Sequence, residues 1–174
     1  MRILSGGRLV FDEELCSNMF VKMIYVFFLA LFTVAATAAE QPYDENADAK
    51  LDIKQALAQG TAAHTPVIVV FGANWCGDCQ MLNKAMKTGT SAPLLAHDFQ
   101  IVKVNVGRFD KNVDIAESYG VPLKKGIPAV VILSNQNRVL YATRDGEVAD
   151  ARRMGEDGVY KFFKRVTADA LAKK

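Results

Sequence analysis

Runs of hydrophobic residues divide the chain after residue 50 into segments whose spacing predicts alternating helices and strands. The apolar residues between positions 51 and 57 recur near helical spacing up to Gly60, where the pattern predicts the end of a helix. Residues 66–72 are mostly β-branched or aromatic and are bounded by Pro66 and Gly72. Such a continuous apolar run is typical of a strand that is buried on both faces.

Helical spacing returns after this strand, where Cys79, Leu82 and Met86 stand at positions i, i+3 and i+7 of one face. The pattern predicts a helix over residues 77–87, so the cysteines lie where strand gives way to helix. The remaining predicted elements are a short helix over 92–97, a strand over 99–106, one or two helical turns over 114–119, strands over 127–133 and 138–142, and an amphipathic helix over 158–174.

This order of elements predicts an α/β fold. The first two strands are expected to be parallel neighbours, and the last two to form a hairpin turned at residues 135–137. Helices on both faces would then flank a central mixed β-sheet, and the helix before the first strand would be an N-terminal helical extension.

A second type of hydrophobic segment precedes the predicted domain. Residues 23–39 carry no charge, follow Lys22 and lead into a polar stretch. A cationic start, an apolar middle and small residues before a polar segment are typical of a secretory signal peptide, which we place at residues 19–39 with cleavage after Ala38 or Ala39. An N-terminal membrane anchor is the alternative, because the run is close to the shortest that spans a bilayer. Its Ala- and Thr-rich end favours cleavage.

Residues 1–18 fit neither the leader nor a fold, since acidic positions 12–14 do not belong in a cationic leader start. We expect this segment to be misassigned or dispensable, with translation beginning at Met19 or Met23. Residues 40–49 are polar and are predicted to form a mobile arm, and residues 50–174 to form the folded domain.

Composition and charge narrow the class of protein. The chain has 174 residues, of which 51% are hydrophobic and 23% are charged, enough for one domain with its own core. Its 21 Lys and Arg residues nearly balance 19 Asp and Glu residues and form no basic stripe, so nucleic acid is not an expected partner. No segment indicates a dimerisation element, and we expect a monomer.

The cysteines indicate chemistry rather than stabilisation. Cys16 precedes the leader and would be lost with it, which leaves Cys76 and Cys79. A disulfide that closes so short a loop removes little entropy from the unfolded chain. Half of a zinc site is the alternative, but zinc needs four ligands, and His64 and His97 lack metal-site spacing and are interpreted as surface residues. We expect no metal and no organic cofactor.

Three features together resemble the thioredoxin superfamily. Residues 75–79, Trp-Cys-Gly-Asp-Cys, resemble its redox site; residues 126–128, Gly-Ile-Pro, are similar to its cis-proline loop; and Lys103 stands in a segment similar to its central strand. These features occur in the family's order between about residues 65 and 170. The resemblance implies a thioredoxin fold and a redox-active Cys76/Cys79 disulfide.

Physical chemistry and the resemblance assign roles within this motif. Cys76, at the start of a helix that stabilises a thiolate, is the expected nucleophile, and Cys79 is the expected resolving thiol. Gly77 and Asp78 shape the turn between them, and the Asp78 carboxylate works against negative charge on Cys76, which predicts a less oxidising couple. The resemblance implies that Trp75 flanks the site as a wall.

The resemblance also implies a groove for substrate polypeptide along Ile127 and Pro128, with a cis bond between them. The sequence departs from the family at the buried acid that assists proton transfer, whose place is taken by Val70. Lys103, the usual partner of that acid, is kept and is a possible aid to proton transfer, along with Asp78 or water. Residues 121–125 lengthen the loop before the proline and could widen the groove.

These features predict a thiol-disulfide oxidoreductase of reductase or isomerase type. Its partners would be exported proteins with disulfides or thiols, and a membrane electron donor or acceptor, most simply in a bacterial periplasm. The alternative is a redox-inactive binding module or metal chaperone on the same fold. The basic pairs at 124–125 and 152–153 are interpreted as solvated charges.

Overall fold

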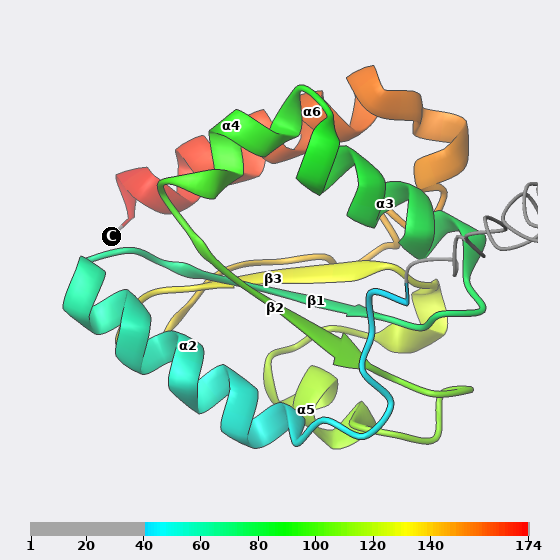
Figure 1. The fold of residues 1–174 in the computed structure, drawn as a ribbon, viewed down its shortest axis with the longest axis horizontal. Coiled ribbons are helices and arrows are strands. Elements are labelled where there is room, and N and C mark those ends of the chain that lie inside the picture. The colour runs from blue at the N-terminus through cyan, green and yellow to red at the C-terminus, as the bar shows by residue number, and fades with distance from the viewer. Residues whose placement is uncertain (1–40, 174) are drawn as a thin grey trace, which may run out of the picture. The chain divides into compact units, whose positions relative to one another are not determined.

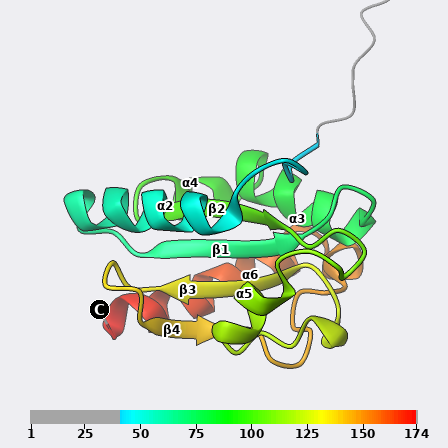
Figure 2. The same ribbon diagram turned by 90° about the horizontal axis from the view of Figure 1, so that it is seen from below.

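The computed structural model describes residues 41–173, so the predictions for residues 1–18 and 19–39 lie outside it. Its centre is a four-stranded sheet with the order β2-β1-β3-β4 (Figure 1). The strands are β1 (Val67–Gly72), β2 (Gln100–Asn105), β3 (Ala129–Leu133) and β4 (Val139–Ala142). β1 and β2 are parallel, whereas β3 is antiparallel to both β1 and β4, and Figure 2 shows the strands side by side. The predicted parallel pair and hairpin are confirmed.

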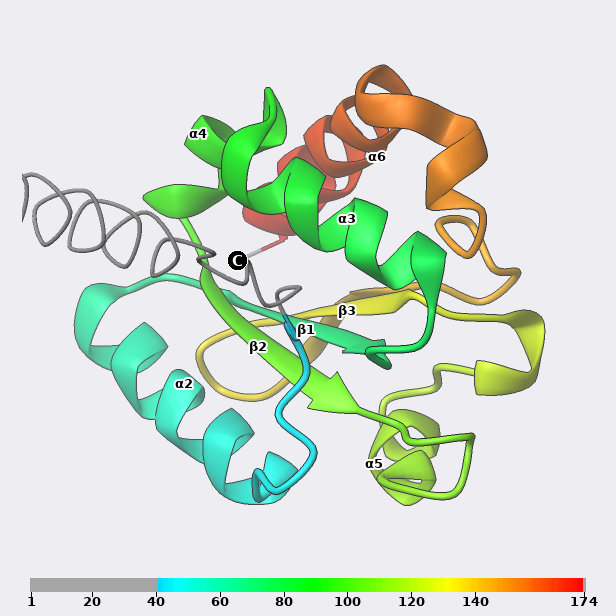
Figure 3. The same cartoon turned by 45° about the vertical axis from the view of Figure 1, so that its right-hand side comes forward.

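Helices cover both faces of the sheet, as predicted. They are α2 (Ala49–Ala63), α3 (Gly77–Thr88), α4 (Ser91–Ala96), α5 (Val113–Ser118) and α6 (Ala151–Ala172). α3, α4 and α6 lie over one face, and α2 and α5 over the other (Figure 1). Seen from a second direction in Figure 3, α3 runs beside α6, so the helix that begins at the cysteines packs against the C-terminal helix.

The two central strands are buried along their whole length, which explains their continuous hydrophobic sequences. Phe71, Ile132 and Leu133 are fully buried and pack with Phe163 of α6 in a single hydrophobic cluster. No helix within residues 41–173 is both long and apolar enough to cross a membrane.

The prediction that the first helix stops at Gly60 is wrong. α2 continues to Ala63, and His64 takes the left-handed conformation at its end, with φ 56°. A Cβ atom on Gly60 would lie 2.6 Å from the carbonyl oxygen of Thr65. The glycine therefore serves close packing of the helix against the chain that follows, and not termination.

The C-terminal helix also begins earlier than predicted, at Ala151 instead of Gly158. Gly155 interrupts it with φ 65° and ψ −179°, a conformation available almost only to glycine. Apolar periodicity starts again at Val159, so the pattern revealed only the part of α6 after the kink. In the part before the kink, Arg152 is hydrogen-bonded to Asp78 at the start of α3.

The prediction of a mobile arm over residues 40–49 is wrong for its described part. Tyr43 is 1% exposed, and its main chain is bound by Asn74, whose side chain accepts from Tyr43 N at 3.0 Å and donates to Tyr43 O at 2.8 Å. The Tyr43 ring covers Gly72, where any Cβ atom would overlap it. Asp48 then caps α2 by accepting from the backbone N–H groups of its first turn. One aromatic side chain thus anchors a polar stretch.

Candidate active site

Cys76 lies at the junction of the loop after β1 with α3. It is the N-cap residue of α3, with extended backbone angles, and its Sγ accepts a hydrogen bond from Cys79 N at 3.1 Å. A serine or aspartate oxygen commonly occupies this position, because the first N–H groups of a helix have no partner within the helix. Those N–H groups and the helix dipole favour negative charge on the Cys76 sulfur.

The two cysteines form a disulfide, with their Cα atoms 5.2 Å apart, so the structure represents the oxidised protein. Cys79 is fully buried, whereas Cys76 keeps 6% of its surface exposed. An incoming sulfur can therefore approach the pair only from the side of Cys76.

The loop before β3 borders the exposed sulfur. The Ile127–Pro128 peptide bond is cis, and the carbonyl oxygen of Ile127 lies 3.6 Å from Cys76 Sγ. Ile127 is 51 positions from Cys76 in the chain and reaches it because β3 lies beside β1. Two motifs recognised separately in the sequence are thus in contact.

Trp75 forms one side of the site, with 52% of its surface exposed. Its Nε1 donates to Gly107 O at 2.8 Å, which fixes the ring against the loop after β2. Phe109 meets the ring edge to face with centroids 6.1 Å apart, and the Arg108 guanidinium lies 5.9 Å from the ring centroid. The carbonyl group of Gly107 thus orients this side chain.

Asp78 is bound by α6. Its Oδ1 accepts from Arg152 N at 2.9 Å, and its Oδ2 accepts from Arg152 Nη2 at 3.0 Å. The hydrogen bond from the guanidinium, more than any other influence, holds the pKa of Asp78 below its ordinary value. Arg152 is exposed, as interpreted from the sequence, but it is also paired with Asp78, which the sequence did not reveal. No local pattern could have revealed this pair, because 74 positions separate its members.

Val70 occupies the place of the family's buried acid and is itself buried. It pairs in register with Lys103 on β2, whose Nζ donates to the side-chain oxygen of Asn83. Asn83 is buried one helical turn after Cys79, on the same side of α3. Lys103, which lacks the acidic partner found in the family, is thus paired with an amide. An amide oxygen accepts a hydrogen bond but does not act as a base near neutral pH. Asn83 is a polar residue on the otherwise apolar face of α3, and this could have indicated a buried polar contact from the sequence.

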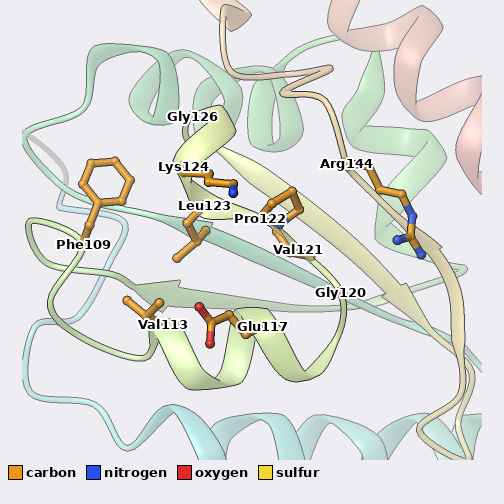
Figure 4. Close-up of a pocket in the computed structure, with 10 residues that line it drawn as sticks. All are labelled: Phe109, Val113, Glu117, Gly120, Val121, Pro122, Leu123, Lys124, Gly126 and Arg144. Carbon is orange, nitrogen blue, oxygen red and sulfur yellow. The ribbon is translucent and has the colours of Figure 1, made fainter.

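A pocket of about 760 Å³ lies next to this site (Figure 4). It is lined by Phe109, Val113, Glu117, Gly120, Val121, Pro122, Leu123, Lys124, Gly126 and Arg144. Apolar side chains form its floor, and Glu117, Lys124 and Arg144 bring charge to it. It meets the redox site at two points, through Phe109 against Trp75 and through Gly126 beside Ile127. The residues of the lengthened loop supply one wall.

Comparison with known proteins decides the family. The sequence model of the thioredoxin-like proteins matches residues 48–134, which is half of the chain. The chain belongs to the thioredoxin-like family. A thioredoxin-like neighbour among solved structures is the disulphide isomerase from Xylella fastidiosa Temecula1, with 45% identity and a TM-score of 0.71 over 75% of this chain and 99% of that one. The predicted thioredoxin fold is confirmed.

Thioredoxin-like relatives among curated proteins carry two kinds of name. A protein disulfide-isomerase of Ricinus communis is 27% identical over 83% of this chain, and a thioredoxin of Griffithsia pacifica is 37% identical over 42% of it. The chain spans 27% of the first relative's length and 61% of the second's. A thioredoxin of Pseudomonas aeruginosa is 32% identical over 52% of this chain and 74% of its own.

The thioredoxin-like site thus brings together most residues that the sequence singled out. Cys76, Cys79 and Ile127 are in contact, while Lys103 reaches the turn of α3 behind Cys79. Sequence reasoning missed Tyr43, Asn74, Asn83, Phe109 and Arg152. Within residues 41–173, no three His, Cys, Asp or Glu side chains gather closely enough to hold a metal ion.

Proposed function

We propose that this chain is a thiol-disulfide oxidoreductase that uses the Cys76/Cys79 couple on polypeptide substrates, as a reductase or an isomerase. The observation that carries the proposal is the position of Cys76 Sγ, which receives a helix N–H and is the exposed sulfur of the pair. Relatives named thioredoxin and disulfide isomerase support the same class of activity. Cys76 is the nucleophile in this proposal, and Cys79 is the resolving residue.

The reaction transfers two electrons. The Cys76 thiolate attacks one sulfur of a substrate disulfide, which breaks the S–S bond, forms a mixed disulfide and releases the other substrate sulfur as a thiolate. Cys79, deprotonated, then attacks Cys76 Sγ, which releases the second substrate sulfur. The substrate is reduced to two thiols, and the protein dithiol is oxidised to the disulfide seen in the structure. A dithiol donor must then reduce the protein again.

Substrate polypeptide would lie along residues 126–128, whose backbone borders Cys76. A chain bound there in extended form places its cysteine over the exposed sulfur. The neighbouring pocket would receive a side chain close to the reacting cysteine, and its apolar floor favours an apolar one. Trp75 would bound the other side of the substrate.

Export is part of the proposal and rests on residues 19–39, which have the composition of a signal peptide. After cleavage, the protein would meet disulfides of other exported polypeptides, in the periplasm of a bacterium. Electrons would come from, or pass to, a membrane partner. N-terminal sequencing of the protein from whole cells tests this part, since an unprocessed N-terminus would contradict cleavage after Ala38 or Ala39.

The activity is tested by insulin reduction with dithiothreitol as the electron source. We expect the wild type to accelerate precipitation of the insulin chains and Cys76→Ser to lose the acceleration. In the full-length, unprocessed chain, Cys16→Ser is the matched control, because it also removes a thiol but lies outside the redox pair. A wild type no faster than Cys76→Ser would overturn the proposal in favour of a redox-inactive binding module. Equilibration with glutathione then gives the reduction potential, which sets the direction of transfer.

A further inference from the structure

The carboxylate of Asp78 lies at the start of two helices. Asp78 is in the first turn of α3, and its Oδ1 accepts from the backbone N–H of Arg152, in the first turn of α6. Asp150, the N-cap residue of α6, instead directs its carboxylate to Arg153 Nη2. Asp78 thus takes over part of the capping of a neighbouring helix, which brings the Arg152 side chain to the redox turn.

The guanidinium of Arg152 covers this turn. A Cβ atom added to Gly77 would lie 3.2 Å from Arg152 Nη1 and 3.3 Å from its Cζ, so the guanidinium lies against the residue that follows Cys76. Its Nη2 also binds Asp78 Oδ2. One positive charge therefore adjoins both residues between the cysteines.

These positions set the electrostatic field at the Cys76 sulfur. An ionised Asp78 two residues from Cys76 disfavours a thiolate there, and a guanidinium paired with Asp78 offsets that effect. Two other charged groups approach the same turn: Arg108 lies over the Trp75 ring, and Glu45 accepts from the Asn74 side chain. Within residues 41–173, neither group forms a hydrogen bond or ion pair with Asp78 or Gly77. The charged side chain that contacts the residues between the cysteines is Arg152.

We propose that Arg152 is a positioning residue for the redox reaction, which keeps the Cys76 thiol reactive by offsetting the charge of Asp78. The inference rests on the proposed function and deepens it. Replacement of Arg152 leaves the Asp78 carboxylate uncompensated beside Cys76, which raises the thiol pKa. The dithiol form is then less favoured and the couple becomes more reducing.

The test measures alkylation of the reduced, full-length protein by iodoacetamide, with modification of Cys76 quantified by peptide mass spectrometry between pH 5 and 10. Arg152→Gln is expected to slow modification at pH 7 by about threefold to tenfold and to move the pH profile upward. Arg152→Lys, which keeps the charge, is expected to restore most of the rate. Arg153→Gln is the matched control, because Arg153 is adjacent but pairs with Asp150, and it should match the wild type.

The Asp78→Asn background decides how Arg152 acts. With the carboxylate removed, Arg152 loses the partner that holds its guanidinium against the redox turn, so Arg152→Gln should change the rate less than twofold. An Arg152→Gln rate equal to that of Arg153→Gln would overturn the inference, as would an effect of equal size with and without Asp78. Thermal unfolding of each variant shows whether it is folded, and Arg152→Met, which also removes the charge, replaces Arg152→Gln in the test if that variant is not. Alkylation needs no protein substrate, so a failure to reduce insulin overturns the proposed function without deciding this one.

Discussion

The Lys103 ammonium donates a hydrogen bond to the Asn83 amide oxygen on the turn of α3 that follows Cys79. This contact gives the partly buried lysine a neutral partner where the family's pattern places an acid. The arrangement holds the lysine in position but supplies no carboxylate to accept the proton of the resolving thiol. The rate of resolution should therefore respond to an acid introduced nearby.

Replacement of Val70 by Asp is expected to accelerate resolution of the mixed disulfide by at least about tenfold, because it places a general base opposite Lys103. Trp75 is the chain's only tryptophan and adjoins the disulfide, so its fluorescence can follow single turnovers in a stopped-flow instrument. Val70→Asn is the matched control, since it buries a polar group without a base. Equal rates for the two variants would mean that proton removal is not limiting.

Removal of the Tyr43 hydroxyl is not expected to lower the free energy of unfolding. Within the described residues this hydroxyl is buried without a hydrogen-bond partner. Tyr43→Phe should therefore leave the free energy of unfolding unchanged or raise it by up to about 1 kcal/mol. Tyr43→Ala should lower it by about 3–5 kcal/mol, because it empties the space over Gly72. Urea unfolding of both variants measures the difference, and a large loss in Tyr43→Phe would show that the hydroxyl has a partner.

Burial also raises the pKa of Tyr43 above its ordinary value of 10.0, which predicts a pH dependence. Above pH 10 the unfolded tyrosine loses its proton while the folded one keeps it, so stability falls as pH rises from 10 toward the folded value. Tyr43→Phe should weaken this alkaline loss. Tyr141, whose pKa burial raises to about 12, contributes a similar loss and should leave part of the slope in the variant. Identical slopes would contradict the burial of Tyr43.

The pocket beside residues 126–128 predicts a substrate preference. Lys124 and Arg144 bring two positive charges to it against one negative charge on Glu117. A disulfide-linked peptide with an acidic residue beside its apolar side chain should therefore react faster than its lysine counterpart. The double variant Lys124→Glu, Arg144→Glu should reduce that preference by about threefold to tenfold in kcat/KM.

Lys125 offers a control within the same loop. It pairs with Asp145 and does not line the pocket, so Lys125→Glu should keep the wild-type preference. The two peptides are compared by competition in one reaction, with products separated by mass. A preference lost equally in Lys125→Glu would mean that overall charge, and not the pocket, selects the substrate.

The Asp78 carboxylate predicts how stability responds to acid. Its pKa lies below its ordinary value of 3.8, chiefly because Arg152 donates to it, so the pair contributes stability above pH 3.8 that is lost as pH falls through the lower folded value. Asp78→Asn should flatten the acid limb of a plot of unfolding free energy against pH. Asp114→Asn, which removes a carboxylate paired with Lys50 on the exposed surface, should flatten it less.

Local patterns predicted the parts of the fold whose residues are neighbours in the chain. The bounds of β1, β3 and α3 were predicted to within about two residues. Their buried positions recur with the spacing of a strand or a helix, and this spacing is visible in the sequence. The redox motif and the proline loop were recognised for a similar reason. Gly60 misled the prediction, since a glycine used for close approach looks the same in sequence as one that ends a helix.

Contacts between distant residues were the part that sequence could not supply. Tyr43 and Asn74 are 31 positions apart, and Asp78 and Arg152 are 74 apart. Each of these residues is ordinary in its own segment: a tyrosine in a polar stretch, and an arginine in a basic pair. Only the fold that brings β1, α3 and α6 together reveals their partners.

The separation of Asp78 from Arg152 has a consequence for minimal versions of this protein. A fragment cut to residues 48–134 would retain both sulfurs and the Ile127 carbonyl, yet it would discard Arg152, Tyr43 and one edge of the sheet. Such a fragment would keep the reacting pair of sulfurs. It would lose the arginine that we propose adjusts their reactivity.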